Sequence, residues 1–262
     1  MITYKRVITC PHSVEVEIYN SYREVGKSYG GRGVNRSLSP EKQRKANEIR
    51  TVRKWERVID CNFDERGYFC RFSAPYGTFA GEKEFRRETG NFFKRVKYRC
   101  DKAGLEFKYI GFIECGKSGK NWHMHIVLSA EVAQIARKCW HWPNGGINLS
   151  PLWENHSYEK LAAYIRKDIT SGSEDAEVYP AKKRMMASRN LKRPEVTVNK
   201  CKRSEIRKLE RGEYMDPPEG FYMVKDELNK TISDVTGAAY YFKFCKIEYE
   251  RRRGRGCAGG AS

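Results

Sequence analysis

The spacing of hydrophobic and polar positions divides the chain into alternating helical and extended segments. Apolar residues recur every three to four positions in the helical segments, whereas short apolar runs bounded by turn-forming residues mark the extended ones. The pattern predicts helices at 40–58, 81–103, 130–140, 158–169 and 204–213. It predicts strands within 1–25 and at 67–74, 107–115, 122–128, 146–149 and 240–249. This alternation predicts an α+β fold in which helices cover a central antiparallel sheet.

The strands at 107–115 and 122–128 are joined by the short polar sequence Gly-Lys-Ser-Gly-Lys-Asn. Glycine, serine and asparagine favour tight turns. The expected connection is therefore a β-hairpin whose tip lies at Ser118 and Gly119.

Two histidines in the second strand of this hairpin alternate with an apolar residue, as His123-Met124-His125. Because the side chains of a strand alternate between two faces, both histidines point to the same face. An antiparallel register places Glu114 opposite His123 and Phe112 opposite His125, which adds a carboxylate to the two imidazoles. Two nitrogen ligands and one oxygen ligand leave coordination positions open, and this set suits Mn²⁺ or Mg²⁺, with Zn²⁺ as a further option. The alternative is a pair of histidines on a polar strand face without a metal.

The segment at 158–169 has the pattern of an amphipathic helix with a tyrosine outside its apolar stripe. The stripe consists of Tyr158, Leu161, Ala162, Ile165 and Ile169. Tyr164 lies on a different face, between Lys160 and Lys167. Positive charges favour the phenolate and attract a phosphodiester, so this tyrosine is a candidate nucleophile that would form a covalent phosphotyrosine. The alternative is an ordinary surface tyrosine on a basic helix.

Composition points to a polyanionic partner. The chain has 51 Lys and Arg against 33 Asp and Glu, a net charge of +18, and its 13% of aromatic residues supplies stacking surfaces for unpaired bases. A basic protein with solvated lysines would explain the charge but not the ordered motifs. The candidate phosphate contacts are Lys117, Lys120, Lys160, Arg166, Arg184, Arg189 and Lys192.

In combination, these motifs resemble those of the HUH endonucleases, specifically the single-tyrosine initiators of rolling-circle replication in phages and plasmids. The resemblance is carried by Glu114, the His-Met-His run at 123–125 and the Tyr-Ile-Arg-Lys run at 164–167. The segments at 60–73 and 187–194 resemble the first core strand of such initiators and the stretch that follows their tyrosine helix.

The resemblance implies roles for particular residues of this chain. In that family the paired histidines bind a divalent metal, which carries over onto His123 and His125 with Glu114 as the third ligand. The tyrosine that nicks single-stranded DNA corresponds to Tyr164, and the lysine that assists it to Lys167. The position four residues before the tyrosine, where some members have a second tyrosine, holds a lysine here, so one nucleophile is implied.

The family's fold is an RRM-like or ferredoxin-like core, and this chain is expected to carry additions at both ends. We expect an N-terminal basic extension and helix at 1–57 and the nuclease core at 58–200. The remainder, 201–262, is expected to be a C-terminal extension of helix and strand that ends in a disordered basic tail.

The function that the resemblance implies is replication initiation, in which the protein nicks and rejoins single-stranded DNA through a 5′-phosphotyrosine. The expected partners are single-stranded DNA or an origin hairpin, together with a host helicase and polymerase, and the protein is expected to act as a monomer or weak dimer. The sequence contains no glycine-rich Lys-Ser/Thr phosphate loop, which argues against a helicase activity of its own. The alternatives are an HUH transposase or conjugative relaxase, or a noncatalytic protein that binds single-stranded nucleic acid on an RNA-recognition-like sheet.

Several sequence features bear on the compartment. There is no secretory leader and no apolar run of membrane-spanning length, and the nine cysteines form no Cys-x-x-Cys pair. The sequence therefore predicts free thiols in a reducing host-cell cytoplasm and no membrane partner.

Overall fold

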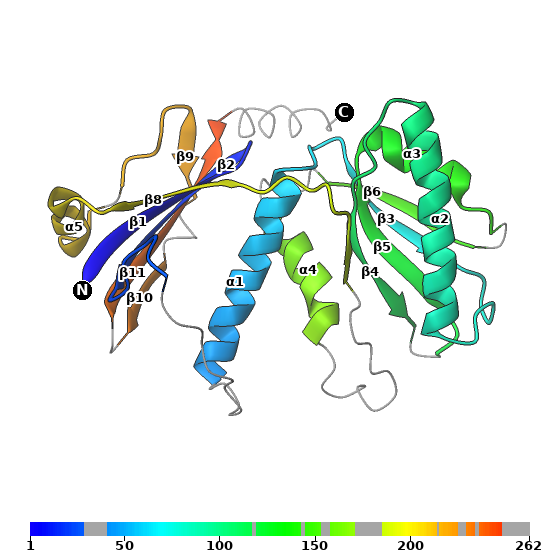
Figure 1. Cartoon of the computed structure of the whole chain (residues 1–262), viewed down its shortest axis with the longest axis horizontal. Helices are drawn as coiled ribbons and strands as arrows, with labels where there is room; N and C mark the ends of the chain where they lie inside the picture. Colours follow the sequence, from blue (N-terminus) through cyan, green and yellow to red (C-terminus); the bar gives the residue numbers. More distant parts are fainter. Residues whose placement is uncertain are drawn as a thin grey trace, which may run out of the picture. The chain divides into compact units, whose positions relative to one another are not determined.

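The computed structural model describes residues 1–28, 41–116, 119–142, 145–152, 158–170, 185–213, 215–224, 229–233 and 236–247. The chain forms two compact units, one of residues 1–40 with 194–262 and one of residues 41–193. Each unit contains an antiparallel sheet, and the described residues include five helices (Figure 1). The predicted α+β class is therefore confirmed. None of the described helices combines the length and the hydrophobicity that crossing a bilayer requires.

The unit of residues 41–193 is built on a five-stranded sheet with the strand order β6-β3-β5-β4-β7. All neighbouring strands in this sheet are antiparallel. Its strands are β3 (Tyr68–Ser73), β4 (Ile110–Cys115), β5 (Trp122–Leu128), β6 (Ile147–Pro151) and β7 (Met185–Ala187). The central strand β5 is buried along its whole length, as expected for a strand covered on both faces.

Two pairs of helices cover the two faces of this sheet (Figure 1). They are α1 (Glu41–Asp60), α2 (Glu82–Lys102), α3 (Ala130–Cys139) and α4 (Glu159–Thr170). Helices α2 and α3 pack on the face that presents Met124, Ile126 and Leu128. Helices α1 and α4 pack on the opposite face, around Val127 and Ile110. Since side chains alternate along β5, His123 and His125 share the face of Val127, beside α4.

Close packing of β4 against β5 requires a glycine at position 111. Gly111 lies opposite Ile126 in the ladder, and a Cβ atom added to it would overlap the backbone carbonyl oxygen of His125 and lie 2.8 Å from the Cα of Ile126. These backbone atoms cannot move aside without disturbing the ladder. We expect Gly111→Ala to lower the free energy of unfolding by about 3 kcal/mol, measured by urea denaturation.

Gly90 provides the control for this prediction. It lies in α2, where an added Cβ would meet nothing within 4 Å. Because alanine has the higher helix propensity, Gly90→Ala should raise the free energy of unfolding by up to about 1 kcal/mol. A Gly111→Ala protein as stable as the wild type would contradict the β4–β5 packing described here.

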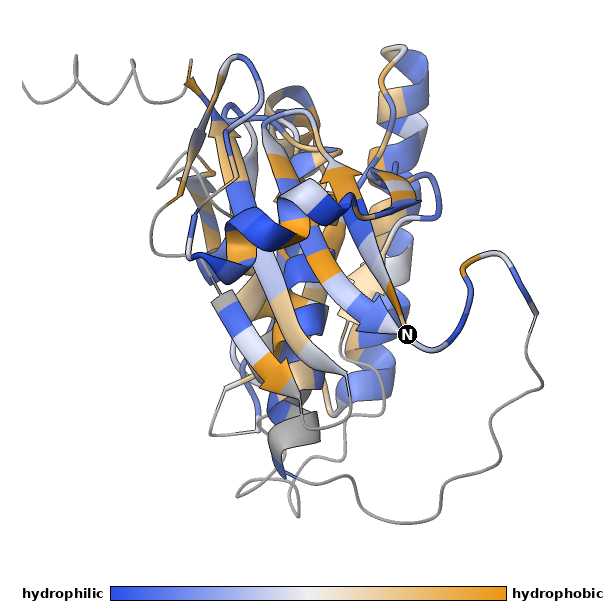
Figure 2. Cartoon of the chain, turned by 90° about the vertical axis from the view of Figure 1, so that its left-hand side faces the viewer, coloured by the Kyte–Doolittle hydropathy of each residue, from blue (hydrophilic) through white to orange (hydrophobic). Residues whose placement is uncertain are grey.

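The unit formed by the two chain ends contains a second antiparallel sheet, with the order β10-β11-β2-β1-β8 and β9 paired to β11. Its elements are β1 (Ile2–Thr9), β2 (Ser13–Ser21), β8 (Glu195–Lys200), α5 (Arg203–Glu210), β9 (Phe221–Met223), β10 (Asn229–Ser233) and β11 (Gly237–Lys246). Strands of this sheet alternate between hydrophilic and hydrophobic residues (Figure 2). Val14, Val16 and Ile18 of β2 pack with Leu209 of α5 in a separate core.

Most of the predicted elements occur within a few residues of their expected bounds, but β4 begins later than predicted. Phe107 and Tyr109 precede the strand and stack with Phe93 of α2, at ring-centroid distances of 5.6 and 4.3 Å. An aromatic cluster against α2 therefore accounts for the apolar character that resembles a strand. The predicted basic tail after residue 250 lies outside the described residues.

Candidate metal centre

The hairpin of β4 and β5 brings together the residues singled out in the sequence. Glu114 is paired with His123 and Phe112 with His125, so the predicted register is confirmed. The turn that sets this register is closed by a hydrogen bond from the Gly116 amide to the Asn121 carbonyl oxygen, at 2.9 Å. Gly119, which was predicted at the tip, has the positive φ of +71° that glycine adopts without strain.

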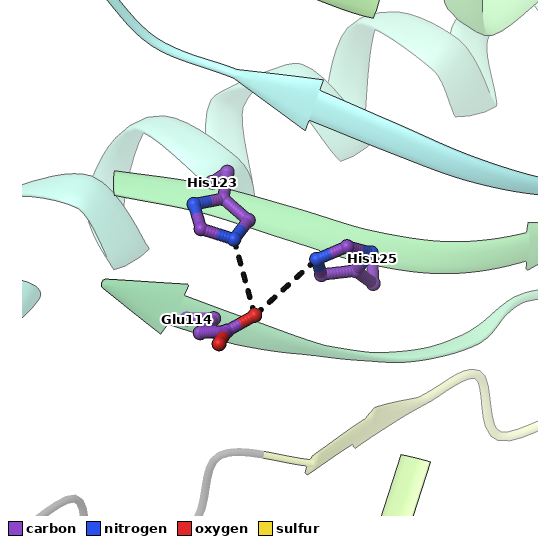
Figure 3. Close-up of side chains that lie close together, drawn as sticks. All are labelled: Glu114, His123 and His125. Atoms are coloured by element: carbon purple, nitrogen blue, oxygen red, sulfur yellow. Dashed lines mark hydrogen bonds and ion pairs between the residues drawn. The ribbon is translucent and has the colours of Figure 1, made fainter. Parts of the chain in front are cut away.

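The three side chains converge on one point (Figure 3). Glu114 Oε2 lies 3.1 Å from His123 Nε2 and 3.3 Å from His125 Nε2. One ligand atom from each residue lies within 4.8 Å of the others, so the group could hold a metal ion. Both histidines are buried, and the carboxylate is partly exposed. This leaves an open side toward solvent, as a catalytic metal site requires.

The surroundings of His123 indicate that a positive charge belongs between these atoms. Its Nδ1 lies 3.1 Å from the carbonyl oxygen of Asn121, and its Nε2 lies against the carboxylate oxygen of Glu114. A neutral imidazole has one N–H, yet this ring has an acceptor at each nitrogen. With Nδ1–H donated to Asn121, the lone pair of Nε2 is available to a cation held jointly with Glu114. The residues present therefore fit a divalent metal.

The charge states of the site favour the same use. The hydrogen bond with His123, and then the one with His125, hold the pKa of the Glu114 carboxyl well below its usual range. Burial lowers the pKa of His125, and the charge of Arg71 acts in the same direction, whereas the hydrogen bond to Glu114 opposes them. At neutral pH the carboxylate is ionised and His125 is neutral, which are the forms that bind a metal.

Tyr164 of α4 lies beside this cluster. Its ring centroid is 5.8 Å from that of His125, and the two rings meet edge to face. The side chain is 43% exposed, whereas Ala162 and Ile165 of the same helix are fully buried. The predicted separation of Tyr164 from the apolar stripe is therefore confirmed among the described side chains. The sequence did not predict that the tyrosine ring would contact His125.

Tyr158, the other tyrosine near this helix, has a structural environment. Its hydroxyl donates a hydrogen bond to the Phe63 carbonyl oxygen, at 3.3 Å. Burial, together with the negative charge of Asp60, raises its pKa well above the usual value. Tyr158 therefore stays a neutral phenol bonded to the backbone.

The predicted basic residues differ in what the structure shows of them. Lys120, Lys160, Arg189 and Lys192 are exposed. The backbone of Lys192 is held by Asn62, whose side-chain oxygen accepts the Lys192 amide at 2.8 Å. Lys117 and Arg184 lie outside the described residues, as do the side chains of Arg166 and Lys167.

One exposed cation next to the cluster was missed in the sequence. Arg71 of β3 is paired with His125 in the ladder, so its side chain lies on the face of the two histidines. The alternation of Phe69, Arg71 and Ser73 indicates which residues share a face, but not which strand lies next to them. That neighbour became evident only with the order β6-β3-β5.

Comparisons with known proteins bear on the segment that carries this site. Residues 78–169 match the profile of a family of replication-associated proteins of the ORF2 type. The match spans the region from the start of α2 to Ile169 of α4, and it includes the Glu114 cluster and Tyr164. The similarity suggests a replication initiator. Searches of curated proteins and of solved structures found no match.

Proposed function

We propose that this chain starts rolling-circle DNA replication as a metal-dependent, site-specific endonuclease and strand transferase acting on single-stranded DNA. The observation that carries the proposal is the contact between Tyr164 and His125, with ring centroids 5.8 Å apart. It puts a partly exposed phenol next to a Glu-His-His cluster that suits a divalent cation. The similarity of residues 78–169 to replication-associated proteins supports the same role.

In this reaction Tyr164 is the nucleophile. Its phenolic oxygen forms a bond to the phosphorus of the scissile phosphodiester while the bond from phosphorus to the 3′ oxygen breaks. The phenol loses its proton, and the departing oxygen ends as a 3′ hydroxyl. The phosphodiester energy is retained in the 5′-phosphotyrosine, so attack by a DNA hydroxyl can rejoin a strand.

The other residues support this transfer. Glu114, His123 and His125 would hold Mn²⁺ or Mg²⁺, which supplies Lewis-acid polarisation of the phosphate when bound. Lys167 stabilises negative charge near the phenolate or the phosphate, as the resemblance implies. Arg71 and the exposed lysines Lys120 and Lys160 bind neighbouring phosphates. The substrate is unpaired DNA, either a single strand or an origin hairpin, because a regular duplex does not offer its phosphate to such a site.

We expect the wider setting to be the cytoplasm of the host cell. A host helicase and polymerase would unwind and extend the nicked strand, and the protein would act as a monomer or weak dimer. A second subunit or a released DNA hydroxyl would then complete the strand transfer that a single tyrosine starts.

The proposal is tested with the full chain, Mn²⁺ and single-stranded oligonucleotides that tile the replication origin of the encoding element. Each oligonucleotide is labelled at its 5′ or its 3′ end and resolved on a denaturing protein gel. We expect a protein band that carries only the 3′ label, because the DNA on the 3′ side of the nick stays attached through its 5′ phosphate. DNA binding with no adduct, across all origins and metals, would instead favour the noncatalytic binding protein.

The assignment of Arg71 leads to a separate prediction. Arg71→Ala should weaken binding of single-stranded DNA by about tenfold, the loss of one charged hydrogen bond. The slope of log affinity against log salt should fall by about one. Fluorescence anisotropy with a labelled oligonucleotide at several salt concentrations measures both effects.

Lys94 of α2 is the matched control for Arg71. It is an exposed cation on a helix that packs on the opposite face of the same sheet. Lys94→Ala removes one positive charge without touching the histidine face, so its affinity should stay close to that of the wild type. Equal losses in the two variants would show that Arg71 contributes only to the general field of the protein.

A further inference from the structure

The imidazole of His125 lies between two phenyl rings. Phe112 of β4, its partner in the ladder, stacks on one side with a centroid distance of 4.9 Å and an interplanar angle of 20°. Phe69 of β3 stacks with a centroid distance of 5.4 Å and an angle of 16°. Because β5 runs between β3 and β4, the two phenyl rings approach His125 from opposite neighbouring strands. We call Phe69 and Phe112 the aromatic clamp.

The hydrogen bonds of His125 show why such a clamp matters. A histidine that binds metal through one nitrogen is normally oriented by a hydrogen bond from the other. His123 follows this rule, since its Nδ1 faces the Asn121 carbonyl oxygen. In His125, Nδ1 is buried and has no hydrogen-bond partner among the described residues. Ring packing is therefore what holds the plane of this imidazole.

The aromatic clamp also reaches Tyr164. The tyrosine ring lies 5.9 Å from Phe69 and 5.8 Å from Phe112, in edge-to-face arrangements that aromatic pairs favour. With the 5.8 Å contact to His125, Tyr164 thus contacts all three stacked rings. A shift of either phenyl ring would change the position of the histidine and of the tyrosine together.

We propose that Phe69 and Phe112 are positioning residues, which orient His125 toward a bound divalent cation and set Tyr164 beside it. The first half concerns metal affinity and needs no DNA. The second half rests on the proposed function, because it concerns the rate at which Tyr164 attacks a phosphate. Phe112 is fully buried, whereas Phe69 is only partly buried and tolerates substitution better.

The test of the first half is calorimetric titration of Mn²⁺ into the full chain without DNA. Phe69→Leu keeps an apolar side chain but removes the ring, and we expect it to weaken Mn²⁺ binding by about tenfold, as the loss of an orienting partner typically does. Phe69→Tyr keeps the ring at a partly buried position and should restore the wild-type affinity.

Phe72 of β3 is the matched control. It lies on the opposite face of the same strand and packs with Phe92 and Trp140, at centroid distances of 5.2 and 5.5 Å. Phe72→Leu removes an equally aromatic and more deeply buried contact, so it should cost at least as much stability and leave Mn²⁺ affinity unchanged. Equal Mn²⁺ affinity in Phe69→Leu and the wild type would overturn the clamp. So would an equal loss in Phe69→Leu and Phe72→Leu, or a wild type that binds no Mn²⁺.

The second half is tested by the rate of covalent DNA attachment at saturating Mn²⁺. If the clamp also positions Tyr164, Phe69→Leu should remain slower than the wild type after its metal site is filled. Full recovery of the rate would overturn the positioning of Tyr164. Adduct formation by the wild type with unaltered Mn²⁺ binding by Phe69→Leu would overturn the clamp alone, whereas Mn²⁺ binding without any adduct would overturn the proposed function.

Discussion

Tyr164→Phe should reduce covalent attachment of single-stranded DNA by at least about a thousandfold, because the substitution removes the attacking oxygen. The phenyl ring keeps its contacts with Phe69, Phe112 and His125, so the fold and the metal site are preserved. Binding of the oligonucleotide should remain at the wild-type level, because binding depends on charge and not on the hydroxyl. Adduct formation and anisotropy, measured on the same preparation, separate the two effects.

Tyr158→Phe is the control for this experiment. Tyr158 has its hydroxyl bonded to the Phe63 carbonyl oxygen, so its removal should cost about 1 kcal/mol of stability. The rate of DNA attachment should not change. An adduct that survives Tyr164→Phe and disappears in Tyr158→Phe would reassign the nucleophile to Tyr158.

His123→Ala should abolish metal-dependent cutting and weaken Mn²⁺ binding by more than about 100-fold, because it removes a ligand of the cation. The substitution also leaves the Glu114 carboxylate without the partner that most strongly keeps it ionised. Calorimetric titration of Mn²⁺ and cleavage of a labelled oligonucleotide measure the two losses. Tyr164 remains in place, so DNA binding without cutting is the expected phenotype.

His141 supplies the matched control for His123. It follows α3 and contacts Arg95 and Glu88 of α2, away from the Glu114 cluster. His141→Ala should bind Mn²⁺ and cut DNA at wild-type levels. Cutting that persists in His123→Ala with metal still bound would contradict the assignment of the ligands.

The register of the metal hairpin could be predicted because it depends on local sequence. The turn between Gly116 and Asn121 is short and rich in turn-forming residues, and the alternation of side chains then places Glu114 opposite His123. The apolar stripe of the tyrosine helix is local in the same sense, since Ala162 and Ile165 follow the helical repeat. Local periodicity therefore identified the candidate ligands and the candidate nucleophile.

The neighbours of these residues could not be predicted, because they come from distant parts of the chain. Strand β3 lies next to β5 although more than 40 residues separate Ser73 from Trp122, and this pairing puts Phe69 and Arg71 beside His125. Similarly, β1 pairs with β8 and β2 with β11, which joins the two ends of the chain in one sheet. Periodicity shows that a segment is a strand, but the choice of partner depends on packing across the whole unit.

The most direct test of the account is the identification of the residue that becomes linked to DNA. Trypsin cleavage after Lys160 and Arg166 releases the peptide 161–166, in which Tyr164 is the only tyrosine, whereas Tyr158 remains on the peptide 139–160. After digestion of the adduct with trypsin and nuclease, mass spectrometry should find a nucleotide joined through its 5′ phosphate to the peptide 161–166. A nucleotide on any other peptide, or one joined through its 3′ phosphate, would contradict the assignment of Tyr164 as the nucleophile.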